Sequence, residues 1–332
     1  MKVLLYFEDE NLIAKSGVGR ALQHQKKALE SAGISYTTDS KDTDYDILHI
    51  NTYGVTSQFV IGNARRNHKP VIYHAHSTKE DFMNSFVLSN ALAPLVKKRL
   101  CDLYNLADLL ITPTPYAKHL LEGYGLKMPI FPVSNGIDLS QYESDDRKIQ
   151  AFYDYFHLTP KDKVIIGIGL LFQRKGILDF IKVAEMLPEY YFIWFGDISR
   201  ILIPGKIIRA IDNCPENVEF PGYIFGDVLK GALLAADCFF SPSYEETEGI
   251  AVLEALASKQ TCVLRNIGAY ESWAESGKNC YLGNTNVEFA NRIQEICSNR
   301  IPATGEGAYR VAQSRSIDQI GKELKAIYEI LL

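Results

Sequence analysis

The chain alternates short, continuously apolar runs with longer segments of helical periodicity, and this alternation constrains the fold more than any other feature. A run that is apolar at every position predicts a strand covered on both faces, as in parallel sheets packed between helices. The predicted strands form two sets: Val3–Phe7, Ile47–Ile50, Val71–His76, Leu109–Thr112 and Ile130–Val133, and then Val164–Leu170, Tyr191–Phe195, Val218–Phe220, Cys238–Ser241 and Thr261–Leu264.

A polar stretch over residues 138–163, rich in Asp and Lys, separates the two sets. We interpret it as a linker that contains a short helix. The sequence therefore predicts an α/β protein with two doubly wound, Rossmann-like domains facing each other across a ligand cleft, which suits a length of 332 residues. The predicted boundaries are 1–140 for the first domain, 141–160 for the linker and 161–315 for the second domain. A C-terminal helix over 316–332 could pack on either domain, the first included.

Composition excludes several classes of protein. A net charge of −5 argues against a general nucleic-acid binder. The six cysteines are scattered without a Cys-x-x-Cys motif, which is typical of reduced thiols in the cytoplasm. The apolar N-terminus is too short for a signal peptide, and no apolar run is long enough for a transmembrane helix. We therefore expect a cytoplasmic protein.

The first strand is followed by a glycine-rich loop, Lys15-Ser-Gly-Val-Gly-Arg20, that leads into a helix. Gly17 and Gly19 would let the backbone approach a phosphate or a sugar closely. The dinucleotide motif G-x-G-x-x-G is incomplete because position 22 is Leu, which weakens a nicotinamide-binding interpretation. The alternative is a tight strand-to-helix turn without a ligand.

Two glutamates, Glu246 and Glu254, flank the start of a helix that Gly249 opens after the strand Cys238–Ser241. Free backbone N–H groups and the positive end of the helix dipole lie between the two carboxylates, which favours an anion site. A ligand that joins hydroxyl groups to a phosphate fits this arrangement, and nucleotide sugars are such ligands.

The turn after the strand Val164–Leu170 carries Arg174 and Lys175. Cations at the carboxyl end of a strand would stabilise a departing phosphate without a metal. The alternative is a pair of exposed basic residues on a turn. A D-x-D pattern over residues 42–46 could hold a divalent cation, but it precedes a strand, so we interpret it as a solvated turn and expect no metal site.

His74 and His76 lie at the end of another predicted strand, and alternation places both on one face. They could pack or line a cleft, or one of them, His76 by its position, could lie near a reacting sugar. A third metal ligand is not evident. Residues 82–100 mix large apolar residues with Lys97, Lys98 and Arg99, which suits either an anionic membrane interface or a core helix with a basic turn.

Together these motifs resemble the retaining glycosyltransferases of the GT-B fold, family four, over nearly the whole chain. The resemblance includes the glycine-rich loop, the histidine after an early strand, Ser134-Asn-Gly-Ile-Asp138, the Arg-Lys-Gly turn and the E-x7-E segment. The segments Glu-Glu-Thr-Glu-Gly-Ile and His-Ala-His-Ser-Thr-Lys-Glu-Asp are most similar to bacterial glycolipid synthases that add a second hexose to monoglucosyldiacylglycerol.

The resemblance implies a role for each matching position. Glu246 would bind donor-sugar hydroxyls and Glu254 the ribose, while His76 would lie at the acceptor side. The other implied contacts are Lys175 and the N–H groups of Gly249, Ile250 and Ala251 with the diphosphate, the backbone of Tyr223 and Ile224 with uracil, and Gly17 and Gly19 with the donor. Arg174 could replace the arginine that the family usually carries at Leu170, and Thr247-Glu248 stands where Gly-Phe is common.

The resemblance thus implies an enzyme that transfers a hexose with retention from UDP-glucose or UDP-galactose to a glucosyl-diacylglycerol, without a metal or other cofactor. It would work at the inner face of the cell membrane as a peripheral protein. A polysaccharide acceptor, as in capsule or teichoic-acid assembly, is the nearest alternative. A non-catalytic partner protein of the same fold and a Rossmann oxidoreductase are further ones.

Overall fold

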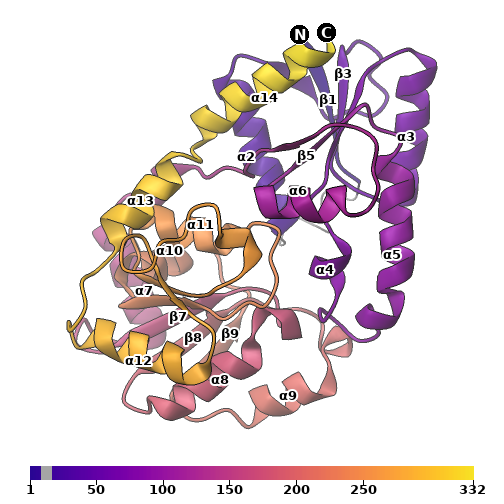
Figure 1. Ribbon diagram of the computed structural model, residues 1–332. Helices are drawn as coiled ribbons and strands as arrows, with labels where there is room; N and C mark the ends of the chain where they lie inside the picture. Colours follow the sequence, from indigo (N-terminus) through magenta and orange to yellow (C-terminus); the bar gives the residue numbers. More distant parts are fainter. Residues whose placement is uncertain (9–16) are drawn as a thin grey trace. The chain divides into compact units, whose positions relative to one another are not determined.

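The computed structural model describes residues 1–8 and 17–332, and these residues divide into two compact units. Unit 1 comprises Met1–Phe82, Asn90–Ile137 and Arg315–Leu332. Unit 2 comprises Met83–Ser89 and Asp138–Ser314. Each unit holds one parallel six-stranded sheet covered by helices (Figure 1), so the prediction of two Rossmann-like domains is confirmed. The chain enters unit 2 at residues 83–89, well before the predicted linker.

The sheet of unit 1 has the strand order β2-β1-β3-β4-β5-β6. Its strands are β1 (Lys2–Tyr6), β2 (Ser35–Thr37), β3 (Ile47–Ile50), β4 (Val71–His74), β5 (Leu109–Thr112) and β6 (Ile130–Pro132). Its helices are α2 (Gly17–Ser31), α3 (Val55–Arg66), α4 (Lys79–Phe82), α5 (Ser89–Tyr104), α6 (Pro115–Glu122) and α14 (Ile317–Leu331).

Alternate residues of each strand in unit 1 enter two different cores. Val3 and Leu5 of β1 pack with residues of α2 and α14, whereas Leu4 and Tyr6 pack with residues of α3 and α5. Because both faces are covered, every position of the strand is apolar except its solvent-facing start, which explains why the strands appear in the sequence as unbroken apolar runs.

The C-terminal helix α14 belongs to unit 1, where it lies along α2 (Figure 1). Ser316 caps its first turn by accepting a hydrogen bond from the N–H of Gln319. The two helices approach most closely at Gly321, where a Cβ atom would lie 2.4 Å from the carbonyl oxygen of Ala28. Only glycine fits there, so the helix pair depends on this residue.

The sheet of unit 2 has the strand order β12-β11-β10-β7-β8-β9. Its strands are β7 (Val164–Ile168), β8 (Tyr191–Phe195), β9 (Val218–Gly222), β10 (Cys238–Ser241), β11 (Cys262–Arg265) and β12 (Tyr281–Gly283). Its α-helices are α7 (Asp146–Phe156), α8 (Ile177–Met186), α9 (Gly205–Asp212), α10 (Asp227–Ala235), α11 (Ile250–Ala257), α12 (Asn286–Cys297) and α13 (Gly305–Gln313). Four short 3-10 helices complete it, namely η1 (Leu139–Tyr142), η2 (Gln173–Lys175), η3 (Arg200–Leu202) and η4 (Gly268–Tyr270).

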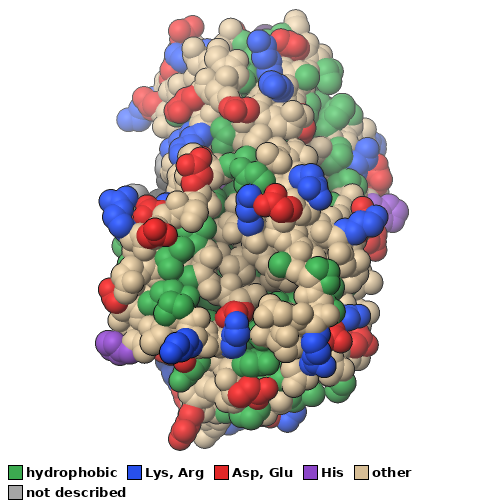
Figure 2. All heavy atoms as spheres, turned by 90° about the vertical axis from the view of Figure 1, so that its left-hand side faces the viewer, with side chains coloured by type: hydrophobic (Ala, Val, Ile, Leu, Met, Phe, Trp, Pro, Cys, Tyr) green, Lys and Arg blue, Asp and Glu red, His purple; other side chains and the backbone are tan. Residues whose placement is uncertain are grey.

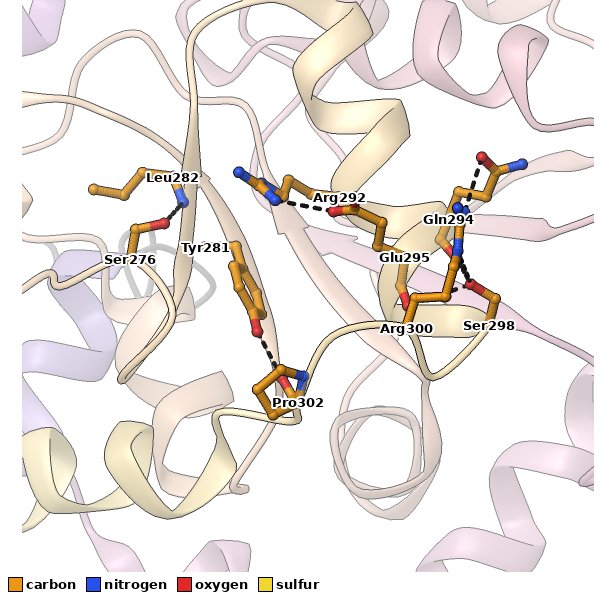
Figure 3. Close-up of polar contacts among 9 residues, drawn as sticks. All are labelled: Ser276, Tyr281, Leu282, Arg292, Gln294, Glu295, Ser298, Arg300 and Pro302. Atoms are coloured by element: carbon orange, nitrogen blue, oxygen red, sulfur yellow. Dashed lines mark hydrogen bonds and ion pairs between the residues drawn. The ribbon is translucent and has the colours of Figure 1, made fainter.

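The predicted strands are all present, with ends that differ by a few residues, and Cys238 and Cys262 are buried free thiols as expected. Two short edge strands, β2 and β12, were not predicted. The strand β12 is held by side-chain hydrogen bonds in addition to apolar burial (Figure 3). The hydroxyl of Tyr281 donates to the carbonyl oxygen of Pro302 at 2.7 Å, and the N–H of Leu282 donates to the Ser276 hydroxyl at 3.2 Å.

Charged side chains of both signs are interspersed with hydrophobic ones on the face that Figure 2 shows. No continuous basic surface forms there, in line with the net charge of −5. Within residues 1–8 and 17–332, no helix combines the length and the apolar character that crossing a bilayer requires.

The helix contact at Gly321 gives a testable prediction. Substitution Gly321→Ala should lower the free energy of unfolding of unit 1 by about 1–3 kcal/mol, because the added methyl group forces α14 away from α2. The matched control is Gly62→Ala in α3, where a Cβ atom meets nothing within 4 Å. That change should stabilise the protein by about 0.5–1 kcal/mol. Urea unfolding of both variants checks the pair, and equal stabilities would contradict the close contact.

Candidate active site

Most of the predicted site residues lie at one edge of the sheet of unit 2. The strands of this sheet are parallel, so their carboxyl ends share an edge, and ligands of doubly wound sheets bind at such edges. Glu246 and Gly249 follow β10, the turn η2 with Arg174 and Lys175 follows β7, and Tyr223 follows β9. Strands β10 and β7 are direct neighbours, which brings the acidic loop and the basic turn together.

Glu246 and Lys175 form a buried ion pair, with 2.5 Å between Lys175 Nζ and Glu246 Oε1. The guanidinium of Arg174 lies 3.7 Å from the other carboxylate oxygen. Burial alone would raise the pKa of the Glu246 carboxyl, but Lys175 and Arg174 outweigh burial and hold the pKa below its usual value. Glu246 is therefore ionised at neutral pH, so it can accept hydrogen bonds but cannot act as an acid.

The basic turn is held against the acidic loop by backbone contacts as well. The N–H of Tyr244 donates to the carbonyl oxygen of Arg174 at 2.7 Å, and Arg174 Nη1 donates to the carbonyl oxygen of Glu245 at 3.0 Å. Gly176, with φ of 77°, lies so close to Pro242 that a Cβ atom would be 2.5 Å from its carbonyl oxygen. These contacts fix the positions of both cations.

Residues 83–89 approach the same turn from an unexpected part of the sequence. Arg174 donates from its backbone N–H to the carbonyl oxygen of Asn84 at 2.8 Å and from Nε to the Ser85 hydroxyl at 2.9 Å. The N–H of Val87 donates to the carbonyl oxygen of Leu202 at 3.0 Å. Arg174 thus links this segment to the acidic loop, which sequence reasoning did not foresee.

The helix α11 begins at Gly249, whose left-handed backbone (φ of 87°) turns the chain into the helix. The amides of Ile250 and Ala251 belong to the first turn, which leaves their N–H groups outside the intrahelical ladder. Tyr270 of η4 packs over this corner, since a Cβ atom at residue 249 would lie 3.0 Å from its hydroxyl oxygen. Burial first, and then the Glu246 carboxylate, raise the pKa of the Tyr270 phenol, which remains a hydrogen-bond donor.

Glu254 is also buried, but it has a different partner. Its Oε1 accepts a hydrogen bond of 3.1 Å from the hydroxyl of Tyr142, which lies in η1 within the predicted linker. The two glutamates are thus separated electrostatically, one beside cations and one beside a phenol. Tyr142 and Tyr270 were missed from the sequence because no motif distinguishes a tyrosine that packs on a site from one in the core.

Tyr223 and Ile224 lie in the loop after β9, which turns at Gly222 with φ of 82°. Tyr223 is partly exposed, and its ring lies 5.9 Å from that of Phe225. An exposed aromatic pair at this edge can stack on a flat ligand. The contact of this loop with a base stays a prediction.

The remaining predicted residues lie in unit 1. His76 follows β4 and is buried, and its Nε2 lies 2.8 Å from Asn51 Oδ1. Burial lowers the pKa of His76 to about 4, although a hydrogen bond with Asn135 opposes this shift, so the ring is neutral at pH 7. Gly17 and Gly19 lie in the first turn of α2. Lys15 and Ser16 of the same loop lie outside the described residues.

Comparison with known proteins places these residues in a family. The profile named "Glycosyl transferases group 1" matches residues 154–311, and "Glycosyltransferase Family 4" matches residues 16–141. The chain is 47% identical over 330 residues to the processive diacylglycerol alpha-glucosyltransferase of Acholeplasma laidlawii, covering 99% of this chain and 98% of that protein. It is 24% identical to the alpha-galactosylglucosyldiacylglycerol synthase of Streptococcus pneumoniae, covering 78% and 71%.

Solved structures agree at the level of the fold. HepE of Anabaena in complex with UDP-glucose superposes with a TM-score of 0.80 at 17% identity, over all of both chains. Sucrose-phosphate synthase of Thermosynechococcus elongatus gives 0.80 at 16% identity, over 100% of this chain and 99% of that one. The two family matches, the relative at 47% identity and the two parallel sheets establish that this chain belongs to the group 1, family 4 glycosyltransferases and is a glycosyltransferase of the GT-B fold.

Proposed function

We propose that this glycosyltransferase moves a hexose from a UDP-sugar to a glucosyl-diacylglycerol and so makes a diglycosyldiacylglycerol. The observation that carries the proposal is the buried Glu246–Lys175 pair beside the start of α11. UDP-glucose is the favoured donor because the relative at 47% identity is named a glucosyltransferase. UDP-galactose is the alternative, since the relative at 24% identity is named a galactosylglucosyl lipid synthase.

The ion pair can serve both ends of such a donor. A diphosphate that reaches Lys175 replaces the carboxylate as its counter-charge, and Glu246 is then free to accept hydrogen bonds from sugar hydroxyls. The N–H groups at the start of α11 add further donors for the diphosphate. Glu254, which already accepts from Tyr142, accepts from the ribose hydroxyls of the same ligand.

The transfer follows a front-side displacement with retention. UDP-glucose carries its sugar in the α configuration, and the name of the 47% identical relative also specifies an α product. As the sugar gains oxocarbenium character, Lys175 and Arg174 stabilise the charge that develops on the leaving UDP. A phosphate oxygen of the donor takes the proton of the acceptor hydroxyl, so the reaction needs neither a side-chain nucleophile nor a metal.

An exposed apolar surface of unit 1 suits a lipid acceptor. Val55 and Phe59 of α3 are 70% and 72% exposed, and Leu92 and Leu95 of α5 are 41% and 65% exposed. The two helices are linked by Arg99 of α5, which donates to Gln58 of α3 and to the carbonyl oxygen of Gly54. We propose that this α3–α5 surface rests on an anionic membrane, with Lys98 and Arg66 exposed beside it.

The same helix α5 also has a structural role. Leu100 and Leu103 enter the core of unit 1, Lys97 lies 4.3 Å from the ring centre of Tyr124, and Arg99 is engaged as described above. Within α5, the core interpretation thus describes the inner face, and the proposed membrane contact concerns the exposed face. Only the exposed face is available to a membrane.

A polysaccharide acceptor has weaker support. The putative teichuronic acid biosynthesis glycosyltransferase TuaC of Bacillus subtilis is 25% identical over 152 residues, which is 45% of this chain and 36% of that protein. A donor screen with vesicles that contain monoglucosyldiacylglycerol separates the two acceptors. A diglycosyl lipid formed from UDP-glucose supports the proposal, whereas activity only on a soluble glycan contradicts it.

Substitutions that remove the charges of Glu246 and Lys175 should distinguish the role of the ion pair in folding from its role in transfer. Glu246→Gln and Lys175→Met should each lower kcat/KM for transfer by about 10²–10³-fold. Each should also destabilise unit 2, because each removes one side of the 2.5 Å ion pair. The loss should be smaller for Lys175→Met, since Arg174 still lies 3.7 Å from the carboxylate. The double variant removes both charges of the pair and leaves Arg174, so its melting temperature should recover in part while its activity stays lost.

Lys182→Met is the matched control, since Lys182 is exposed on α8 and pairs with Glu185 in its own helix. Its activity should equal that of the wild type. Wild-type turnover in the folded double variant would refute the assignment of Glu246 and Lys175 to the site.

The membrane surface can be tested by flotation. Phe59→Ser and Leu95→Ser should each reduce binding to anionic vesicles about tenfold or more, because burial of such a side chain contributes about 1.5–3 kcal/mol. Ile330→Ser is the control, because Ile330 is 60% exposed on α14 of the same unit. If all three variants float like the wild type, the membrane contact lies elsewhere.

A further inference from the structure

A chain of buried polar side chains crosses the interior of unit 1 and ends at His76. Its members are Gln25 of α2, His49 of β3, His74 of β4 and Tyr328 of α14, all buried. The family assignment does not use four of these five residues. Burying so many polar groups in an otherwise apolar core is costly unless they pair with one another.

The amide nitrogen of Gln25 lies between two imidazoles, within hydrogen-bond distance of each. It lies 2.9 Å from His49 Nε2, 3.3 Å from His49 Nδ1 and 3.2 Å from His74 Nδ1. The hydroxyl of Tyr328 lies 2.6 Å from His49 Nδ1. Which ring nitrogen donates and which accepts is set by the tautomer of each imidazole. One amide and one phenol thus contact the two histidines on the far side of the stack from His76.

The three imidazoles also form a stack. The rings of His49 and His74 have centroids 5.4 Å apart and an interplanar angle of 17°. The rings of His74 and His76 are closer, at 4.1 Å and 7°. Since Asn51 holds Nε2 of His76, the His74 ring covers one face of an imidazole whose edge is already anchored. Any tilt of His74 would be transmitted to His76.

We propose that Tyr328, His49, Gln25 and His74 are positioning residues that hold the His76 ring in one plane and one tautomer for the acceptor. The inference rests on the proposed function, because it takes His76 to lie at the acceptor side. It assigns a role to the C-terminal helix α14, because α14 supplies Tyr328, the member of the polar series that lies furthest from His76. None of the four residues touches the substrates.

The charge state of the stack agrees with this role. Burial is the main cause that lowers the pKa of His49 to about 3 and of His76 to about 4, and it lowers the pKa of His74 as well. Repulsion between the rings lowers these pKa values further: His76 acts on His49, and both His76 and His49 act on His74. Unfolded histidine titrates near 6.5, so this part of the stability is present above about pH 6.5 and is lost as the pH falls toward 4.

Two substitutions test the chain without removing a ring from the stack. Tyr328→Phe deletes only the hydroxyl, and Gln25→Glu places a carboxylate between two imidazoles. Tyr328→Phe should lower kcat with the lipid acceptor about tenfold and leave KM for the UDP-sugar within twofold. Gln25→Glu should raise the pKa of His49 and His74 and move the acid limb of the pH–rate profile upward. Tyr36→Phe is the control, because it also deletes one phenolic hydroxyl from unit 1, and that hydroxyl donates to the Glu30 carboxylate in an exposed contact.

A second readout does not depend on activity. Nitrogen-15 NMR of the histidine rings reports the tautomer and the pH midpoint of His76 directly, and both should change in Tyr328→Phe but not in Tyr36→Phe. If Tyr328→Phe has the spectra and the pH profile of the wild type and only a lower melting temperature, these polar residues serve packing alone. That result would overturn the proposal. Full transfer by His76→Ala would overturn it too. If the wild type makes no glycolipid, the proposed function fails, and the spectra still decide whether the chain positions His76.

Discussion

Burial of both faces of each parallel sheet is the constraint on which the rest of this structure depends. Once Val3 and Leu5 enter one core while Leu4 and Tyr6 enter the other, no position inside a strand is left for a group that must meet a ligand in water. Polar chemistry is confined to the strand ends, and in a parallel sheet the carboxyl ends lie together. Glu246, Lys175 and Tyr223 come from three separate segments and still share one edge for this reason.

Bringing charges to such an edge has an electrostatic cost that the structure offsets locally. A buried carboxylate is unfavourable alone, and the pair with Lys175 makes it tolerable without making it strongly stabilising. Such a pair is suited to a binding site, because a ligand that offers an anion to Lys175 and hydroxyls to Glu246 replaces each partner by another. A site with unpaired charges would have to shift their pKa values to stay folded.

The sequence predicted the elements and the chemistry of the site better than it predicted their connections. Continuous apolar runs identified the central strands, but β2 and β12 are three-residue edge strands with too few positions to form a pattern. Alternation correctly placed His74 and His76 together. It could not indicate Gln25 or Tyr328, because the contacts of α2 with β4 and of α14 with β3 depend on tertiary packing. The same reason explains why the periodicity of α14 left its domain undecided.

Residues 83–89 are a second case in which the sequence did not predict a tertiary contact. Nothing in their composition distinguishes them from α5, yet they belong to unit 2 and bond to Arg174. That contact bears on the missing arginine at Leu170. The proposed role of Arg174 at the diphosphate requires a different scaffold, because its guanidinium starts four residues further along the chain than position 170. Ser85, the carbonyl of Asn84 and the carbonyl of Glu245 supply such a scaffold. An arginine fixed at both its backbone and its side chain loses little conformational freedom when a phosphate binds. Arg174 therefore has the properties that a relocated phosphate-binding arginine requires.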